Sequence, residues 1–317
     1  MERGAEENLS FKKGFPRKKT ISLLRKFAKF SKKMLWNIYI GIVGAGRVGS
    51  NVAYWLARAG WRIRAIYSRT AESAQKVAFK IPTGVAQNLE QVFRRCDAVF
   101  LTVPERVLPE ILEQAAEMRY HRAKILVHMS GILPSRVLGL AGLEFFRVAV
   151  HPMAAIPPLS TDRNPFEGVF FSIEGDKIGM DFARSVVLSL GGRFWEIDPD
   201  KKPIYHSAAA VGANAVFANI AVAEKLLAEA GFPRQHLRES VAKLIENSVK
   251  NYLAFGIPKG ITGPLTRDDY ATLMAHIKVL SQTPYFRMFV ESMRVYAQLL
   301  GKSEIFESIL DDAIQDE

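Results

Sequence analysis

Cysteine is nearly absent from this chain of 317 residues, in which Cys96 stands alone. One cysteine cannot form a disulfide within the chain, and it cannot supply the several thiolates of a cysteine-based zinc site. We predict no metal centre. The scarcity of cysteine fits a reducing compartment, and the N-terminal segment lacks the long uncharged apolar run of a secretory signal. We therefore expect a cytoplasmic protein.

A strong excess of one charge is also lacking once the N-terminal segment is set aside. The chain carries a formal charge of +11, but residues 1–33 hold eleven Lys and Arg against three Glu and account for +8 of it. The remaining residues carry only +3, which argues against a nucleic-acid partner. We expect residues 1–35 to form a basic, disordered tail. Two alternatives are a true start at Met34 and a short amphipathic helix that touches anionic surfaces.

No membrane span is predicted. The best candidate is the uncharged stretch from Pro203 to Ala223, which has about the 20 residues that a bilayer requires. It is built mainly from Ala and other small residues, and it contains His206, Asn214 and Asn219. That composition suits a buried helix of a soluble protein better than a lipid-facing helix.

From Ile38 onward, short apolar runs alternate with helical patterns. Ile38–Val43 is continuously apolar, as expected of a parallel strand that is buried on both faces. Further strands are predicted over residues 62–67, 98–103, 124–129, 145–150, 168–174 and 193–197, and the chain after Pro203 is predicted to be all helical. Strands that alternate with helices predict an α/β fold with a doubly wound parallel sheet. We therefore expect three parts: the tail (1–35), a dinucleotide-binding domain (36–155), and an extension with a helical substrate and dimerisation domain (156–317).

A glycine motif, Gly44-Ala45-Gly46-Arg47-Val48-Gly49, follows the first predicted strand and opens a helix. In a GxGxxG of this kind the first glycine permits a tight turn, the second lets the backbone approach a pyrophosphate, and the third lets the helix pack on the strand. The helix N-terminus then faces the phosphates. The motif predicts a dinucleotide site in a Rossmann sheet. The alternative is a structural turn in a domain that has lost its cofactor.

The second predicted strand lacks the carboxylate that usually grips the ribose 2′-hydroxyl of NAD. It ends instead in Tyr67-Ser68-Arg69-Thr70. Arg69 can pair with a 2′-phosphate, and Ser68 and Thr70 can donate hydrogen bonds to it. The cofactor is therefore predicted to be NADP.

Three other strand ends are expected to line the crevice beside the cofactor, because ligands of open α/β sheets lie beyond the carboxyl ends of the strands. Val103-Pro104 and Ser130 are predicted to contact the cofactor. Ser130 could also hydrogen-bond a substrate, Gly131 leaves room for one, and His151 is a candidate substrate contact or acid. A histidine before a proline is as often structural.

The segment Lys201–Asn214 carries our predicted catalytic residues, Lys202, His206 and Asn214. It is rich in Ala and Gly, so the helix can approach a ligand closely, and buried polar side chains among small apolar ones require partners. Transfer of a hydride to a carbonyl also needs a proton donor, which His206 or Lys202 could be. The alternative is that His206 and Asn214 are core residues that hold helices together.

A third polar stretch, Thr262–Asp269, opens the helix that carries His276. Its turn could bind an anionic substrate through the free backbone N–H groups near Thr262, and Arg267 could clamp a carboxylate. A plain helix cap with a surface Arg–Asp pair is the alternative.

Together these motifs resemble a family of proteins assigned as NADP oxidoreductases, in which a Rossmann-like domain precedes a C-terminal domain of unknown function. The resemblance covers about residues 36–300. It is carried by GIVGAGRVG, YSRT, VHMSG, HPM, KKPIYHSAAAVGAN and TGPLTRDD followed by His276. The family is similar to a wider group that includes 3-hydroxyacid and 6-phosphogluconate dehydrogenases, pyrroline-carboxylate reductase and ketopantoate reductase.

The resemblance implies an NADP-dependent oxidoreductase that acts on a small, anionic substrate and forms a homodimer through its helical domains. In the wider group a Lys or similar acid near the start of this helix and an Asn further along serve the reacting carbonyl, positions that match Lys202, His206 and Asn214. The family's usual Arg-Gly-Asp reads Arg267-Asp268-Asp269 here, which puts the conformation of that loop in question. Our first expectation for the substrate is a 2-oxo acid such as ketopantoate. An imine of the pyrroline-carboxylate kind, or NADP binding by a non-catalytic regulatory protein, are the alternatives.

Overall fold

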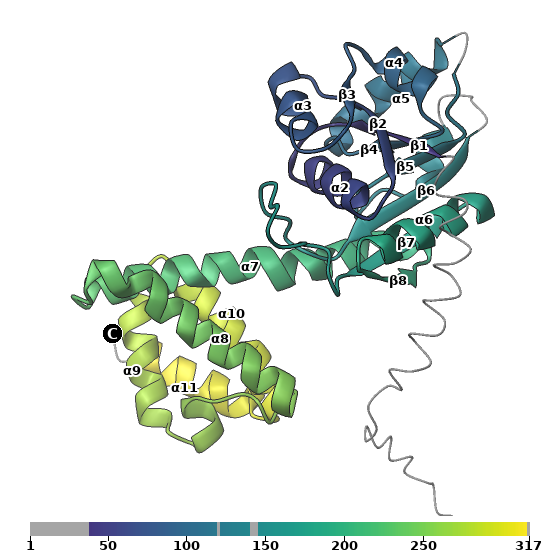
Figure 1. The fold of residues 1–317 in the computed structure, drawn as a ribbon. Coiled ribbons are helices and arrows are strands. Elements are labelled where there is room, and N and C mark those ends of the chain that lie inside the picture. The colour runs from purple at the N-terminus through teal and green to yellow at the C-terminus, as the bar shows by residue number, and fades with distance from the viewer. Residues whose placement is uncertain (1–37, 119–120, 140–144, 316–317) are drawn as a thin grey trace, which may run out of the picture. The chain divides into compact units, whose positions relative to one another are not determined.

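The computed structural model describes residues 38–118, 121–139 and 145–315, so the expected tail (1–35) lies outside the described residues. The chain divides into two compact units, the first ending at Ala213 and the second beginning at Asn214. The first unit is an α/β structure and the second is helical (Figure 1). This confirms the predicted fold class.

The strands and helices follow one another as the alternation predicts. The strands are β1 (Tyr39–Val43), β2 (Arg62–Tyr67), β3 (Gly84–Val85), β4 (Ala98–Leu101), β5 (Ile125–His128), β6 (Phe146–Pro152), β7 (Phe170–Gly175) and β8 (Arg193–Glu196). The α-helices are α2 (Arg47–Arg58), α3 (Ala71–Ala78), α4 (Leu89–Arg95), α5 (Leu108–Ala116), α6 (Lys177–Ser189), α7 (Lys202–Glu229), α8 (Leu237–Phe255), α9 (Tyr270–Ser281), α10 (Phe286–Leu300) and α11 (Ser303–Gln315). The 3-10 helices are η1 (Glu105–Val107), η2 (Ser135–Gly139), η3 (Pro199–Lys201), η4 (Arg234–His236) and η5 (Pro264–Arg267).

All eight described strands form one sheet in the order β3-β2-β1-β4-β5-β6-β7-β8. The pairs from β3 through β6 are parallel, so their carboxyl ends lie along one edge. Strand β7 runs antiparallel to β6, and β8 is parallel to β7. The sheet is therefore doubly wound with two reversed strands at one side.

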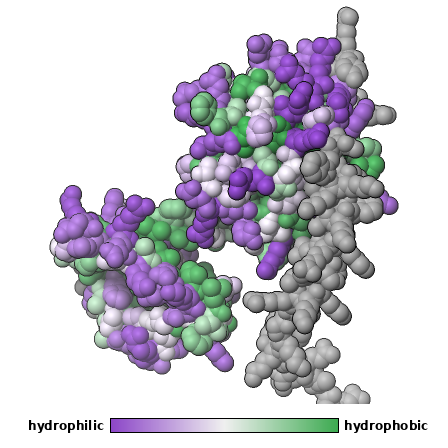
Figure 2. All heavy atoms as spheres, viewed as in Figure 1, coloured by the Kyte–Doolittle hydropathy of each residue, from purple (hydrophilic) through white to green (hydrophobic). Residues whose placement is uncertain are grey.

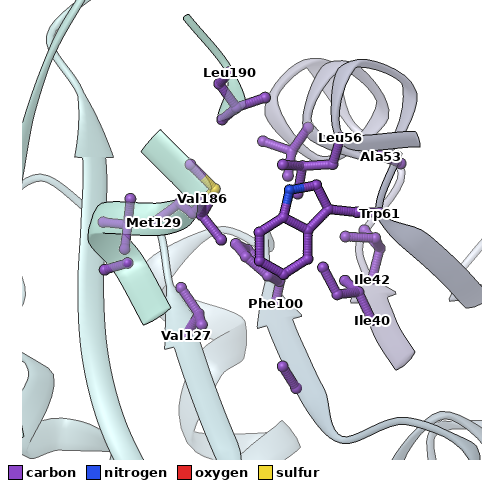
Figure 3. Packing of buried hydrophobic residues seen from close by; sticks show 14 of the residues in the cluster. Ile40, Ile42, Ala53, Leu56, Trp61, Phe100, Val127, Met129, Val186 and Leu190 are labelled. Carbon is purple, nitrogen blue, oxygen red and sulfur yellow. The ribbon is translucent and has the colours of Figure 1, made fainter. Parts of the chain in front are cut away.

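Apolar side chains cover both faces of the sheet, which explains the continuous apolar run of β1. One face packs against α2, α3 and α6, and the other against α4 and α5 (Figure 1). The tryptophan that precedes β2 anchors the first face. Figure 3 shows Trp61 surrounded by Leu56 of α2, Phe100 of β4, and Ile40 and Ile42 of β1.

The first unit extends beyond the predicted domain boundary at residue 155. Strands β7 and β8 continue the same sheet, and the side chains of β7 and α6 join its apolar core. The first turns of α7 also belong to this unit, which ends at Ala213. The sequence pattern places the boundary earlier because the run of parallel strands ends there.

The second unit contains the rest of α7 and helices α8 to α11. Its core is a small cluster built around Leu273 and Ile277 of α9, Ala297 of α10 and Phe306 of α11. Within the described residues one helix, Pro199–Glu229, is long and apolar enough by length and composition to cross a membrane.

Candidate active site

The glycine motif forms a turn between β1 and α2, which we call the glycine turn (Gly44–Gly49). Gly44 has φ +103°, a conformation that side chains rarely adopt, and a Cβ there would lie 2.6 Å from the carbonyl oxygen of Thr102. At Gly49 a Cβ would overlap the carbonyl oxygen of Gly44 and the hydroxyl of Thr102. These two glycines are therefore required by the folded protein itself.

Gly46 differs, because nothing in the protein requires a glycine there. Its φ of −75° and ψ of −167° are open to any residue, and a Cβ would have no atom within 4 Å. Helix α2 begins at the next residue, Arg47, without a side-chain cap and without an acidic residue in its first turn. A free helix N-terminus beside an open backbone fits the pyrophosphate of a dinucleotide.

Thr102 holds the glycine turn in place. Its hydroxyl donates to carbonyl oxygens at the end of β1, with distances of 3.0 Å to Val43 and 2.7 Å to Gly44. Val103 and Pro104, both predicted cofactor contacts, follow it directly, and Val103 Cγ1 lies 3.0 Å from the position of a Gly44 Cβ. This role of Thr102 is not predicted by the sequence pattern.

The end of β2 lies beside the glycine turn, because the Gly44 N–H donates to the Tyr67 carbonyl at 2.8 Å. Ser68, Arg69 and Thr70 follow. Arg69 is exposed, and among the described residues its guanidinium forms no ion pair. The Thr70 hydroxyl bonds to that of Ser73 at 2.8 Å. A cation without a competing carboxylate fits a 2′-phosphate at this position.

Polar side chains gather around the first turns of α7, and we call them the polar cluster. Its members come from β5, the turn after β5, η2, β6, β7 and α7, and all belong to the first unit. They are His128, Ser130, Ser135, His151, Glu174, Lys202, Tyr205 and His206. Buried polar groups need partners, so the contacts within this cluster define what each member can do.

Lys202 and Glu174 form the interior of the polar cluster. Lys202 is 0% exposed; its Nζ donates to the Ser130 carbonyl at 3.3 Å and lies 4.0 Å from Glu174 Oε1. Glu174 accepts from the Ser135 N–H at 2.5 Å and from the Ser135 hydroxyl at 2.7 Å. Burial lowers the pKa of Lys202, and the nearby Glu174 charge raises it. This geometry ties α7 to β7 and to the segment after β5.

His128 is held neutral at the end of β5. It is almost fully buried, and its Nδ1 accepts from the Ser130 N–H at 3.2 Å, which places the proton of the neutral ring on Nε2. Burial and, to a smaller extent, the Lys202 charge lower the pKa of His128 from 6.5 to about 3.

His151, Tyr205 and His206 form the outer part of the polar cluster. His151 Nδ1 lies 2.9 Å from the Tyr205 hydroxyl, and the His151 and His206 ring centroids are 5.4 Å apart at 78°. Burial lowers the pKa of His151 to about 4, with smaller contributions from His206 and Lys202. His206 Nδ1 is fully buried and has no hydrogen-bond partner among the described residues. Imidazoles at the carboxyl edge of the sheet can hold or transfer a proton.

Gly131 lies against both rings. A Cβ on Gly131 would meet His206 Nδ1 at overlapping distance and His151 Nε2 at 2.8 Å. The space that the sequence analysis assigned to a ligand at Gly131 is therefore occupied by these two rings. The Ser130 hydroxyl accepts from the N–H groups of Ile132 and Leu133, at 3.2 and 3.1 Å, and shapes the turn.

The remaining predicted site residues lie in the second unit. Asn214 is exposed on α7, and Thr262 and Arg267 are exposed around the turn before η5 and α9. The structure thus brings together Ser130, Gly131, His151, Lys202 and His206, and it places the other three on a separate unit.

The departure from Arg-Gly-Asp has a structural explanation. Asp268 ends η5 in the left-handed conformation, with φ +57°, where glycine is favoured and Asp is among the residues best tolerated. Lys302 Nζ contacts its carboxylate at 2.7 Å, and the Tyr270 hydroxyl donates to it as well. Asp269 then caps α9 by accepting from the Thr272 N–H at 3.2 Å. The loop keeps a glycine-like backbone without the glycine.

Comparison with known proteins agrees with this two-part structure. Residues 31–152 match the Rossmann-like domain, and residues 169–300 match a domain of unknown function, DUF2520. The predicted resemblance is therefore confirmed in its domain composition. No curated protein sequence matches the chain.

Several solved structures share the fold at low sequence identity. One is a Bacteroides fragilis protein that has been assigned as an NADP oxidoreductase. It is 23% identical to this chain, with a TM-score of 0.65 over 86% of this chain and 98% of that one. The 1-pyrroline-5-carboxylate reductase of Streptococcus pyogenes is 15% identical, with a TM-score of 0.58 over 87% and 98%. The Plasmodium falciparum pyrroline carboxylate reductase, solved with NADP bound, is 18% identical, with a TM-score of 0.55 over 87% and 97%.

Proposed function

We propose that this chain, which joins a Rossmann-like domain to a DUF2520 domain, is an NADP-dependent oxidoreductase that reduces a small carbonyl or imine substrate. One observation carries the proposal. Gly46 is a glycine that the folded protein does not need, at an open helix N-terminus, and it lies on the same sheet edge as a half-buried pair of histidines.

The glycine turn would hold the pyrophosphate through the backbone at Gly46 and the first turn of α2. Ser68, Arg69 and Thr70 would hold the 2′-phosphate, and Val103, Pro104 and Ser130 would lie along the rest of the cofactor. The reduced cofactor supplies a hydride when bound. Arg69→Ala should remove most of a preference for NADPH over NADH that we expect to be at least about tenfold. Equal calorimetric affinities for the two cofactors in the unaltered protein would contradict the choice of NADP.

We propose His206 as the proton donor. Arrival of a hydride at a carbonyl or imine carbon leaves negative charge on the oxygen or nitrogen, and a proton from an imidazolium neutralises it. Lys202 is less suited to direct transfer, because its Nζ is fully buried and donates to Ser130, so we assign it a supporting role. The catalytic role of Asn214 and the substrate-binding roles of Thr262 and Arg267, all in the second unit, stay predictions from the sequence.

Two substrate classes are considered. The sequence favours a 2-oxo acid such as ketopantoate. Pyrroline carboxylate reductases among the structural neighbours favour a cyclic imine that carries a carboxylate. Both classes are small anions, as the sequence predicts for the substrate.

The test is a screen for NADPH oxidation over 2-oxo acids and carboxylated cyclic imines, with His206→Gln and the exposed His236→Gln compared on every active substrate. We expect turnover on one class, and a loss of about 10²- to 10⁴-fold in kcat for His206→Gln alone. Tight NADPH binding without turnover on either class would instead favour a regulatory NADP-binding protein.

We also propose that the second unit mediates a homodimer. In this unit, helices α7 and α8 expose large apolar side chains, including Phe217, Leu244 and Leu253, and Figure 2 shows apolar surface on this unit. Neighbouring exposed apolar side chains are typical of an interaction site. The resemblance to the NADP oxidoreductase family also implies that the helical domains pair. Light scattering after gel filtration without detergent should give the mass of two chains. Insolubility without detergent would favour a membrane for the apolar helix.

A further inference from the structure

His206 has a buried nitrogen that lacks a partner. Its Nδ1 is inaccessible to solvent and forms no hydrogen bond with any described residue. An unsatisfied polar atom in the interior costs free energy, so one in a folded protein calls for an explanation. The ring nitrogen that shares its position against Gly131 is His151 Nε2.

His151 is itself held by Tyr205. The Tyr205 hydroxyl lies 2.9 Å from His151 Nδ1 and can donate to the His151 carbonyl oxygen at 3.5 Å. Tyr205 is nearly fully buried, and its ring also meets the His151 ring edge to face at 5.6 Å. With Nδ1 engaged by Tyr205, the other nitrogen of His151 is left to face Gly131 and His206.

We propose that His151 is a positioning residue for His206: its Nε2 accepts a hydrogen bond from the His206 Nδ1–H, with Tyr205 fixing the His151 ring, so that His206 Nε2 is left for proton transfer. This inference rests on the proposed function for its chemical purpose. The two rings are not hydrogen-bonded in this structure, so the proposal requires them to turn toward each other in the unliganded protein in solution.

The protons balance without a further reactant. In the imidazolium form, His206 donates through Nδ1 to His151 Nε2, His151 donates through Nδ1 to the Tyr205 oxygen, and Tyr205 donates to the His151 carbonyl. His206 gives its Nε2 proton to the substrate oxygen or nitrogen as the hydride arrives at carbon. Neutral His206 then regains a proton at Nε2 from solvent, while the Nδ1 proton stays in place.

The surroundings keep His151 an acceptor. The titratable groups around His151 are His206, Lys202 and Tyr205 from α7 and neutral His128 from β5, while Glu174 from β7 lies against Lys202. Burial and the neighbouring cations hold the pKa of His151 near 4, so the ring is neutral at pH 7. A neutral imidazole can accept one hydrogen bond and donate another, as the arrangement requires.

The decisive experiment reads the tautomer of His206 by imidazole ¹⁵N NMR on the full chain without cofactor or substrate. The chain has only six histidines, so His206→Gln and His151→Gln assign both rings. We expect neutral His206 to carry its proton on Nδ1, and His151→Leu to abolish that preference. A proton on Nε2 in the unaltered protein, or an unchanged tautomer in His151→Leu, would overturn the proposal. Because no turnover is required, this result is independent of the proposed function.

Two further variants guard against a His151→Leu chain that does not fold. Tyr205→Phe frees the His151 ring, and Gly131→Ala pushes on both rings without removing a titratable group. Each should shift the His206 tautomer, and each should lower kcat about 10- to 100-fold on an active substrate, with NADPH affinity unchanged. The exposed His236→Gln is the control and should change neither quantity. A His206 tautomer that both variants leave untouched would show that His151 does not orient it.

Discussion

The glycine turn is made of backbone from six consecutive residues, whereas the polar cluster is made of side chains from five separate elements and the turn after β5. In the turn, space is the critical quantity: Gly44 and Gly49 are needed because a Cβ would strike the backbone. In the polar cluster, hydrogen bonding is critical, because Lys202, Glu174 and His128 are buried and each depends on a partner.

The difference predicts two kinds of failure. Larger side chains in the glycine turn should destabilise the fold. In the polar cluster, the loss of a hydrogen-bond partner or the protonation of a histidine should destabilise it. Unfolding of the first unit can be followed by tryptophan fluorescence, because all four tryptophans precede residue 196. Tryptophan fluorescence therefore measures the free energy of unfolding in each of the stability predictions.

Gly49→Ala should have the largest effect. The new methyl would overlap the Gly44 carbonyl oxygen and the Thr102 hydroxyl, and the backbone atom cannot move without opening the turn. We expect a loss of about 3 kcal/mol in the free energy of unfolding, at the upper end for overpacking. Denaturant unfolding followed by fluorescence measures it. A change below about 0.5 kcal/mol, the range of ordinary surface substitutions, would show that the turn is not closely packed.

Low pH should have the second-largest effect, because it protonates histidines of the polar cluster and lowers the free energy of unfolding. The folded pKa is about 3 for His128 and about 4 for His151, both below the usual value of 6.5. Unfolding therefore takes up protons as the pH falls from 6.5 towards 4, and the free energy of unfolding falls with it. Two such histidines give a slope of up to about 2.7 kcal/mol per pH unit.

Single substitutions show how much of that slope comes from each histidine. His128→Leu and His151→Leu should each reduce the slope of the unfolding free energy against pH by up to about 1.4 kcal/mol per pH unit, the contribution of one proton. The exposed His236→Leu should leave the slope as it is. A flat stability profile between pH 6.5 and 4.5 would mean that both histidines are protonated as readily in the folded chain as in the unfolded one.

The sequence predicts the turn well and the polar cluster only in part, and the reason is the same difference. A turn is local, so strand, glycines and helix can be read from neighbouring residues. His151, Lys202 and His206 were each predicted as candidates, but Tyr205 and Glu174 were not. Their roles depend on the reversed pairing of β6 with β7 and on the contacts that the first turns of α7 make with those strands, which no local pattern contains.

Short elements were missed for a similar reason. Helix α4 has only seven residues. Asn88 caps it by accepting from the Gln91 N–H at 3.0 Å, and an Asn at this position is a typical start of a helix. Strand β3 has two residues, and its pairing with β2 is what defines it. Such elements carry too little periodicity to be predicted before the sheet is known.

Ser135→Ala should have an intermediate effect. It deletes the hydroxyl that donates to Glu174 at 2.7 Å and leaves the Ser135 N–H in place. A buried hydrogen bond to a charged acceptor contributes about 2 kcal/mol, so we expect that loss in the free energy of unfolding. Ser185→Ala, which removes an exposed hydroxyl on α6, is the matched control. Equal stabilities for the two variants would mean that Glu174 finds another donor.

Gly46→Ala should have the smallest effect on the fold and should act on the ligand instead. The backbone at Gly46 is open to alanine and a Cβ meets nothing within 4 Å, so the free energy of unfolding should stay within about 0.5 kcal/mol of the unaltered chain. A pyrophosphate that approaches this backbone would meet the new methyl, and NADPH affinity should fall at least about tenfold, or 1.4 kcal/mol. Calorimetric titration with NADPH measures it, and Gly212→Ala, also in open space but on α7, is the matched control and should bind as before. Unchanged affinity in Gly46→Ala would mean that the cofactor does not approach the second glycine. Gly46 would then be a glycine that neither the fold nor the ligand explains.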